Sequence, residues 1–417
     1  MTSRPQSAKL ARRLAKVESP GVTTFGDGWP IFWESAAGAT VTCVDGHQYT
    51  DLTAAFGVAS VGHSNPQVAA AVSQQAGSLM HGMGDVHPPR AKVELLESLQ
   101  RVTPSGLDFA HLGLNGADAV ETALKCSELV TGRAGVIAFE GGYHGLATGA
   151  LGVSARRDFR DPFVGRGLGA TTFVEFPADD STADRVLVEL RRKLSSMGSG
   201  LPPTGALIVE PIQGRGGVVV PPDGFLASLR AVCDEYDLLL IVDEIFTGLG
   251  RTGRWFACEH DEVVPDLLCV GKALGGGMPL SACVGGATSL GKWPVANGEA
   301  LHTATFLGHP VSCAAGIAAL RELSDRGLVE RAARLGERAT ARLSEAGLAV
   351  RGRGLMLGIP LRSGALATEV MLGALDRGVL LLPSGPNGAV LSVTPPLTIG
   401  EAELDDAIDV IVELATP

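Results

Sequence analysis

Four short segments, each apolar at almost every position, most constrain what this chain can fold into. They comprise residues 135–139, 206–209, 238–242 and 267–270, and turn signals bound them. A run without polar alternation is typical of a strand that is buried on both faces of a mainly parallel sheet. Segments with helical spacing lie between the runs. This alternation predicts an α/β fold with a large, doubly wound and mainly parallel sheet domain.

The two ends of the chain show a different pattern. Residues 30–60 indicate short strands that turn at Asp45-Gly46, which is a strong hairpin signal. From about residue 325 onward, helical segments alternate with strands. We therefore expect both ends to combine in a smaller α+β domain. The expected division is an N-terminal arm and part of the small domain at 1–70, a large domain at 71–320, and the rest of the small domain at 321–417.

The composition limits the partners that this protein can have. The chain has 417 residues and a formal net charge of −11, which argues against a nucleic acid or an anionic membrane as partner. We find no segment long and apolar enough for a bilayer, and we read the basic N-terminal stretch as a helical arm. The seven cysteines lack the spacing of a zinc site. We expect buried free thiols, no metal site and a cytoplasmic location.

Lys272 is the first candidate for chemistry. It follows the run 267–270 and precedes three glycines at 275–277. Lysine is rarely buried without a partner, and glycines let another molecule approach the backbone. A desolvated lysine has a lowered pKa and can form a Schiff base with an aldehyde. A surface lysine beside a flexible loop fits the same position, so the sequence leaves both interpretations open.

Three further features lie where ligand sites form in α/β folds. Asp243 follows the run 238–242, at the end of a strand where such sheets bind ligands, although a cap or turn is the alternative. We expect its neighbour Glu244 to be structural. Asn115-Gly116 begins a helix, whose first amides bind phosphate readily or are simply capped by Asn115. Tyr143 lies among glycines and could stack on a flat ring.

One motif points to a different chemistry. Residues 248–253 read Gly-Leu-Gly-Arg-Thr-Gly and fit the GxGxxG spacing of a dinucleotide-binding loop. That fold requires a helix next and an acidic residue about 20 positions further on. The residues that follow have no clean helical face. The sequence therefore disfavours a nicotinamide cofactor.

Taken together, the chain resembles the class III aminotransferases, the group that includes ornithine, acetylornithine and 4-aminobutyrate aminotransferases. The most specific segments are Val-Glu-Pro-Ile-Gln-Gly at 209–214, Val-Asp-Glu-Ile-Phe-Thr-Gly-Leu-Gly-Arg-Thr-Gly at 242–253, and Gly-Lys-Ala-Leu-Gly-Gly-Gly at 271–277. The resemblance implies a fold-type I enzyme that uses pyridoxal 5'-phosphate and works as a homodimer. It also implies ping-pong transfer of an amino group between a small amine or amino acid and a keto or aldehyde acceptor.

The resemblance assigns roles to matching positions. Lys272 is similar to the lysine that carries the cofactor as a Schiff base and moves the substrate proton. Asp243 is similar to the partner of the cofactor's ring nitrogen. The other cofactor positions that it implies are Gly116 and Ala117 at the phosphate, Tyr143 and Ile245 against the ring, and Thr305, which would reach the cofactor of the neighbouring subunit.

The substrate positions depart from the family pattern. Leu146 stands where ornithine-type members have an arginine that binds the substrate α-carboxylate, which points to a less polar amine or aldehyde. Arg215 and Ser392 replace a glutamate–arginine pair that lets one site accept both glutamate and an ω-amine. We expect Arg215 to bind a carboxylate of the donor or the acceptor. The alternative is a solvated loop with a neutral serine opposite.

Transamination is our leading prediction. A pyridoxal-phosphate-dependent aminomutase or amino-acid epimerase would share the cofactor residues, so the sequence separates these reactions poorly. A dialkylglycine-type decarboxylase and an inactive relative are further alternatives, and Lys272 with Asp243 weighs against the last. An unrelated binding module would carry no cofactor at all.

Overall fold

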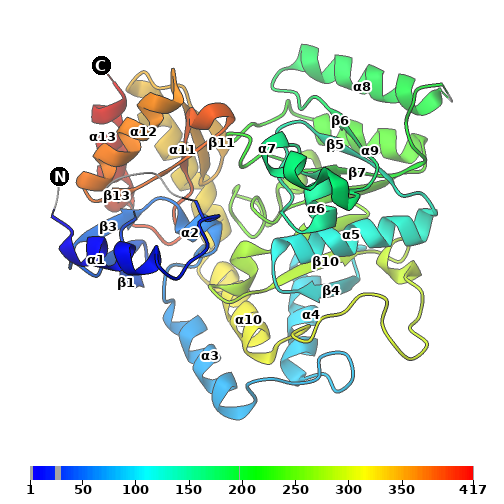
Figure 1. Cartoon of the computed structure of the whole chain (residues 1–417), viewed down its shortest axis with the longest axis horizontal. Coiled ribbons are helices and arrows are strands. Elements are labelled where there is room, and N and C mark those ends of the chain that lie inside the picture. The colour runs from blue at the N-terminus through cyan, green and yellow to red at the C-terminus, as the bar shows by residue number, and fades with distance from the viewer. Residues whose placement is uncertain (1–2, 24–29, 197, 417) are drawn as a thin grey trace.

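The computed structural model describes residues 3–23, 30–196 and 198–416. The chain forms a larger part and a smaller part, and the smaller part holds both ends of the chain (Figure 1). Within the described residues, no helix has the length and apolar character that crossing a membrane requires.

The larger part is built on a seven-stranded sheet with the order β4-β10-β9-β8-β7-β5-β6. The five strands from β9 to β6 are mutually parallel, whereas β10 runs antiparallel to both of its neighbours. The four apolar runs are confirmed as strands of this sheet. Its strands are β4 (Phe109–Gly113), β5 (Gly135–Phe139), β6 (Thr171–Val174), β7 (Thr204–Val209), β8 (Leu239–Asp243), β9 (Leu267–Val270) and β10 (Ser281–Gly285).

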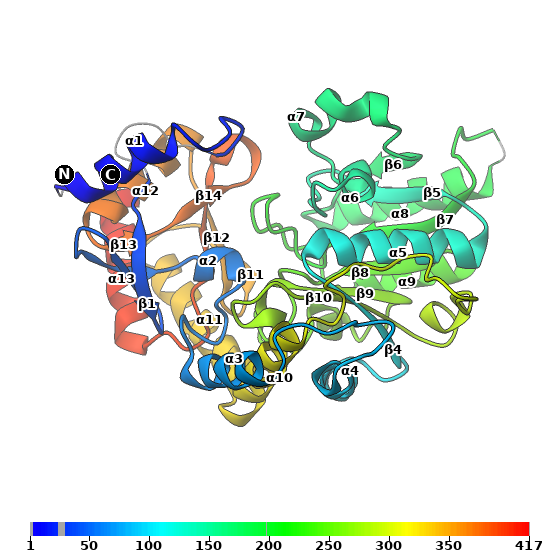
Figure 2. The same cartoon turned by 60° about the horizontal axis from the view of Figure 1, so that its bottom comes forward.

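Helices cover both faces of this sheet (Figure 2). Val120 of α5 packs with Ile208 of β7 in one apolar cluster. Leu229 of α9 packs with Leu207 in another, because successive residues of a strand point to opposite faces. The helices of this part are α4 (Arg90–Val102), α5 (Gly116–Thr131), α6 (Thr148–Val153), α7 (Arg157–Arg160), α8 (Asp180–Ser195) and α9 (Phe225–Glu235).

The smaller part combines both ends of the chain. β2 and β3 form the predicted hairpin, and β13 from the C-terminal region pairs in parallel with β3. The predicted fold class is therefore confirmed, while the boundaries at residues 70 and 320 stay a prediction. The two sheets have the orders β1 (Trp33–Ala37)-β2 (Thr40–Cys43)-β3 (Gln48–Asp51)-β13 (Val379–Leu380) and β11 (Arg351–Arg353)-β12 (Met356–Pro360)-β15 (Val390–Val393)-β14 (Leu382–Ser384).

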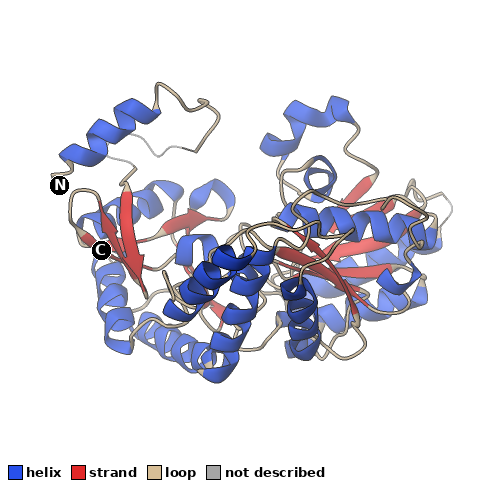
Figure 3. Ribbon diagram, turned by 90° about the horizontal axis from the view of Figure 1, so that it is seen from below, coloured by secondary structure: helices blue, strands red, loops and turns tan. Residues whose placement is uncertain are grey.

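Helices flank these two sheets and join the two parts (Figure 3). α10 contacts α4 of the larger part and α11 of the smaller part. The expected N-terminal helical arm is confirmed as α1. The longer helices outside the larger part are α1 (Pro5–Leu14), α3 (Pro66–Ser78), α10 (Pro310–Asp325), α11 (Leu328–Glu345), α12 (Gly364–Asp376) and α13 (Glu401–Ala415).

One segment of residues 30–60 is not a strand. Ala54, Ala55 and Phe56 have φ angles of 45°, 48° and 63°, and together with Gly57 they form the left-handed turn α2 (Ala54–Gly57). Each such residue costs about 1–2 kcal/mol. The buried carboxylate of Asp51 holds the turn, accepting hydrogen bonds from the backbone N–H groups of Thr53 at 2.8 Å and Ala55 at 3.2 Å. Residue preferences do not predict this turn, because alanine and phenylalanine rarely adopt positive φ angles.

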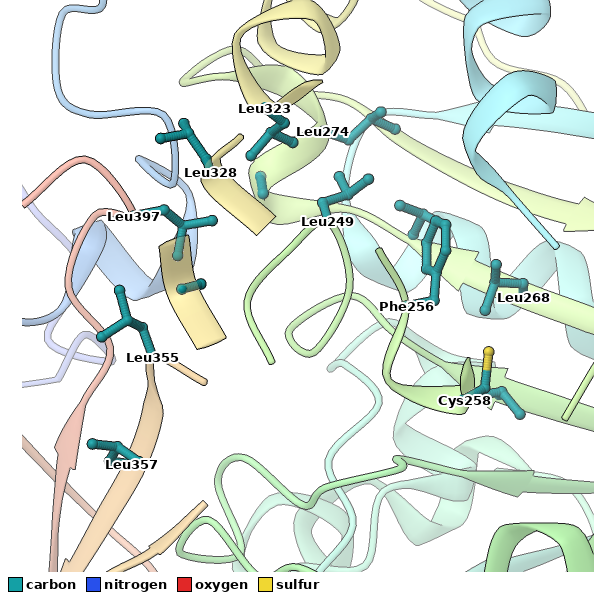
Figure 4. Packing of buried hydrophobic residues seen from close by; sticks show 14 of the residues in the cluster. Leu249, Phe256, Cys258, Leu268, Leu274, Leu323, Leu328, Leu355, Leu357 and Leu397 are labelled. Atoms are coloured by element: carbon teal, nitrogen blue, oxygen red, sulfur yellow. The ribbon is translucent and has the colours of Figure 1, made fainter. Parts of the chain in front are cut away.

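The Gly-Leu-Gly-Arg-Thr-Gly loop joins the two parts. One apolar cluster extends from Leu249 and Phe256 of the larger part to Leu355 and Leu397 of the smaller part (Figure 4). Arg251 is fully buried there, and its Nη1 donates to the carbonyl oxygens of Leu355 at 2.9 Å and Pro395 at 2.6 Å. Burial lowers the pKa of Arg251 to about 9. The loop therefore holds the larger and the smaller part together. It is followed by a short 3₁₀ turn at Ala257–Asp261.

Candidate active site

The candidate residues gather at one edge of the seven-stranded sheet. Asp243 ends β8, Glu210 directly follows β7, Lys272 follows β9, and the loop with Tyr143 follows β5. The strands β9, β8, β7 and β5 are neighbours and parallel. Their carboxyl ends therefore meet at the same edge, where open α/β sheets form ligand sites.

Asp243 is buried and pairs with His144. Its Oδ2 lies 2.7 Å from Nδ1 of His144, and its Oδ1 accepts a hydrogen bond from the backbone N–H of Ile245 at 3.0 Å. Burial alone would lower the pKa of His144, but the hydrogen bond and charge of Asp243, with the charge of Glu210, raise the pKa above its usual value. A protonated imidazole can donate to Asp243 and hold its carboxylate in place.

Lys272 begins the 3₁₀ turn Lys272–Gly275 with a φ of 42°. Its Nζ lies 4.5 Å from the centroid of the Phe246 ring. Burial lowers the pKa of Lys272, and Arg215 lowers it too, while Asp243 and Glu210 oppose the shift. A lowered pKa leaves more of the amine neutral, which is the nucleophilic form. Backbone strain at such a residue indicates function.

The N-terminus of α5 forms a cradle for an anion. Asn115 caps the helix, and its side chain accepts a hydrogen bond from the backbone N–H of Asp118 at 3.2 Å. Helix geometry leaves the amides of Gly116 and Ala117 without partners inside the helix. A Cβ on Gly116 would lie 2.9 Å from Cδ1 of Ile245, so a larger residue here would push the Ile245 side chain aside. Such an N-terminus is suited to a phosphate group.

Tyr143 and Arg215 form a cation–aromatic pair. Cζ of Arg215 lies 4.8 Å from the centroid of the Tyr143 ring. The backbone N–H of Tyr143 donates to Glu210 Oε1 at 2.9 Å, which fixes the start of this loop. The Arg215 side chain is exposed and forms no ion pair with any residue that the structure describes. It is therefore available to bind an anion.

The other two predicted substrate residues differ in their exposure to solvent. The Leu146 side chain is 51% exposed. Ser392 lies on β15 with its Oγ 2.7 Å from Oγ of Ser384, and the neighbouring N–H of Gly385 donates to the carbonyl oxygen of Arg215 at 3.0 Å. The Arg215 loop thus packs beside the hairpin that carries Ser392.

Thr305 is separate from the other candidates. It lies in an exposed turn, and no hydrogen bond among the described residues connects its side chain to Lys272 or Asp243.

Sequence reasoning assigned no role to His144, Glu210 or Phe246, which the structure places in the site. Glu210 had a usable signal, because it follows a buried run as Asp243 does. The structural role expected for Glu244 is confirmed, since its buried oxygens accept hydrogen bonds from the loop 247–258.

The residues present fit pyridoxal phosphate. The cradle of Gly116 and Ala117 suits a phosphate, and the carboxylate of Asp243 retains lone pairs that can accept a proton from a ring nitrogen. Ile245 and Tyr143 supply apolar and aromatic surface for a flat ring. The lowered pKa of Lys272, caused by burial, suits an amine that reacts with an aldehyde.

Comparisons with known proteins agree with this chemistry. The family model described as aminotransferase class-III matches residues 25–414. The putrescine aminotransferase of Pectobacterium atrosepticum is 36% identical over 409 residues, covering 94% of this chain and 85% of that protein. The acetylornithine aminotransferase of Methanopyrus kandleri is 37% identical over 383 residues, covering 91% and 93%.

A solved structure shares the whole architecture. The ornithine aminotransferase from Toxoplasma gondii, described with partial occupancy of PLP at its active site, matches with a TM-score of 0.86. Its sequence identity is 30%, and the match covers 98% of this chain and 94% of that chain.

Proposed function

The chain belongs to the class III aminotransferases, and from this premise we propose that Arg215 selects a substrate that carries a carboxylate. The protein is a pyridoxal-phosphate-dependent enzyme that moves an amino group between an amine and a keto substrate. The named relatives support transamination and not the aminomutase or epimerase alternative. The observation that carries our proposal is the exposed guanidinium on the Tyr143 ring.

The chain's own residues perform the transfer around the cofactor. When bound, pyridoxal phosphate supplies the aldehyde that takes up the amino group and a ring that withdraws electrons from the carbon that loses its proton. In this proposal Nζ of Lys272 holds the cofactor and then moves that proton. Asp243 binds the ring nitrogen, and His144 keeps the Asp243 carboxylate oriented through the 2.7 Å contact. Gly116, Ala117, Tyr143 and Ile245 hold the phosphate and the ring.

Two fixed backbone contacts support the substrate role of Arg215. Gly385 binds its carbonyl oxygen, and Nε of Arg351 donates to the carbonyl oxygen of Gly217 at 3.0 Å. The loop is therefore anchored at Arg215 and two residues further on, while the guanidinium forms no ion pair among the described residues. Ser392 and Leu146 add a neutral and an apolar surface, so we propose that the rest of the substrate is weakly polar.

Replacing Arg215 by alanine is expected to raise KM for carboxylate-bearing substrates about 10- to 100-fold, the equivalent of losing a charged hydrogen bond. Glutamate, alanine and 2-oxoglutarate are suitable probes, because a donor that the enzyme accepts should bleach the visible absorbance of the cofactor-loaded protein and an acceptor should restore it. Amines without a carboxylate should be unaffected. Arg157→Ala, which removes an exposed arginine of α7, is the matched control. Unchanged KM values for all three probes would eliminate the proposal.

We further propose a homodimer in which Thr305 reaches the partner's cofactor. Large apolar side chains are exposed beside Thr305: Met80 is 61% exposed, Met83 56% and Phe306 48%. The rings of His81 and Phe306 lie with centroids 4.9 Å apart, which brings these two segments together. An exposed apolar patch of this kind is typical of a protein interface.

The Thr305→Ala protein should remain dimeric by analytical ultracentrifugation and bind the cofactor about tenfold more weakly, as expected for one lost hydrogen bond to a charged group. Equilibrium dialysis of the cofactor measures the second effect. Thr303→Ala, which loses only the 2.7 Å contact with Asp85, is the control variant. A monomeric wild-type protein would rule out the dimer, and unchanged cofactor affinity would rule out the role of Thr305.

We also infer a cytoplasmic location. All seven cysteines fall within the described residues and are free and buried, which suits a reducing compartment. Fractionation of the producing cells checks this inference, and recovery outside the cytoplasm would contradict it.

A further inference from the structure

Glu210 is a buried carboxylate that binds two separate loops. Its Oε1 accepts a hydrogen bond from the backbone N–H of Tyr143, and its Oε2 accepts one from the backbone N–H of Gly214, each at 2.9 Å. Glu210 is 7% exposed, and it forms no ion pair within the described part of the chain. Burying a carboxylate without a direct cation costs free energy. A glutamate at this position therefore implies a role that a neutral residue could not fill.

The hydrogen-bond pattern itself requires a carboxylate. The two N–H donors meet different oxygens of Glu210. A glutamine has a single acceptor oxygen, and its amide NH₂ would face the second donor. Glutamate is therefore the residue of this length that satisfies both loops.

The two loops carry the residues that contact cofactor and substrate in the proposed function. Tyr143 lies in one of them, and Gly214 immediately precedes Arg215 in the other. The 4.8 Å contact of Arg215 with the Tyr143 ring links the two loops a second time, in addition to their hydrogen bonds with Glu210. Gln213 also connects these two loops, because its Nε2 donates a hydrogen bond to the carbonyl oxygen of Glu140 at 2.7 Å.

We infer that Glu210 is a positioning residue that sets the Tyr143 ring and the Arg215 guanidinium relative to each other. Stacking on the cofactor and recognition of the substrate carboxylate then depend on one buried side chain. The inference rests on the proposed role of Arg215. The negative charge of Glu210 also opposes the effect of burial, which lowers the pKa of Lys272.

Glu210→Gln tests the inference, since it preserves shape but removes one acceptor and the charge. We expect KM for glutamate and 2-oxoglutarate to rise about tenfold and the affinity for pyridoxal phosphate, measured by dialysis, to fall by a similar factor. The pH midpoint of the visible absorbance of the loaded protein should shift to lower pH, because the charge that favours a protonated nitrogen is lost. This shift reports the charge of Glu210, whereas the rise in KM reports its positioning of Arg215. Glu140→Gln, an exposed neighbour in the Tyr143 loop, should change none of the three.

A second variant covers a failure of Glu210→Gln to fold. Glu210→Asp keeps the charge and both acceptors on a shorter side chain, so it should raise KM while leaving the pH midpoint in place. Circular dichroism confirms folding of each variant. Wild-type KM in both variants would overturn the inference.

A double-mutant cycle separates this inference from the proposed function. If Glu210 acts through Arg215, the Arg215→Ala/Glu210→Gln protein should have the KM of Arg215→Ala alone for carboxylate substrates. Unchanged KM in Arg215→Ala would defeat the proposed function. A raised KM in Arg215→Ala, combined with an independent, multiplied effect of Glu210→Gln, would defeat only the role of Glu210.

Discussion

The Lys272→Ala enzyme is expected to lose transamination by about four orders of magnitude or more, because one side chain both holds the cofactor and transfers the proton. The cofactor-free variant should remain folded, since the substitution removes an amine whose burial disfavours the charged form and lowers its pKa. Steady-state turnover and calorimetric unfolding measure the two effects.

Two further observations make the Lys272 experiment specific. A small free amine added to the variant should restore part of the turnover, because it can occupy the space left by the side chain and accept the proton. Lys193→Ala, which removes a lysine paired with Glu189 on α8, should retain wild-type turnover. Turnover within tenfold of wild type in Lys272→Ala would show that another group moves the proton.

Asp243→Asn is expected to lower turnover about a thousandfold, the scale seen when a preorganised electrostatic partner is removed. The amide keeps the shape of the side chain but removes the charge that stabilises a protonated ring nitrogen. It also removes the negative charge beside His144, which helps to raise the pKa of His144 against the effect of burial. The buried imidazole should therefore become neutral in this variant.

The pH dependence of the free energy of unfolding tests the same pair of residues, Asp243 and His144. A histidine with a raised folded-state pKa stabilises the fold fully below its ordinary pKa of about 6.5, and the stabilisation is lost as pH rises through the raised value. Unfolding of the apo wild-type protein should show this loss, and Asp243→Asn should not. Asp237→Asn, an exposed aspartate just before β8, is the control. Turnover of Asp243→Asn within fivefold of wild type would contradict the assigned role.

The buried strands and the residues at their ends could be predicted from sequence. A run such as 238–242 identifies a strand, and Asp243 at its end then falls at the ligand-binding edge. Glu210 occupies the equivalent position directly after β7, but its role depends on two N–H groups from separate loops. Strand patterns contain no information about which loops meet at a carboxylate.

Two other features could not be predicted from sequence patterns, each for a different physical reason. The left-handed turn at Ala54–Gly57 contradicts the preference of alanine and phenylalanine, and contacts with Asp51 impose it. Arg251 lies in a loop that resembles a nucleotide-binding motif, yet its guanidinium joins the two parts of the molecule. The spacing of its glycines does not distinguish these uses.

The parallel pairing of β3 with β13 has a consequence for synthesis on the ribosome. Thr50 is paired with Val379, so the edge of β3 stays open until almost the whole chain has been translated. All strands of the seven-stranded sheet lie between these two positions and can assemble earlier. An unpaired edge invites association with other chains. A nascent chain halted before residue 379 should therefore depend on chaperones, because it lacks β13, the strand that covers the open edge of β3.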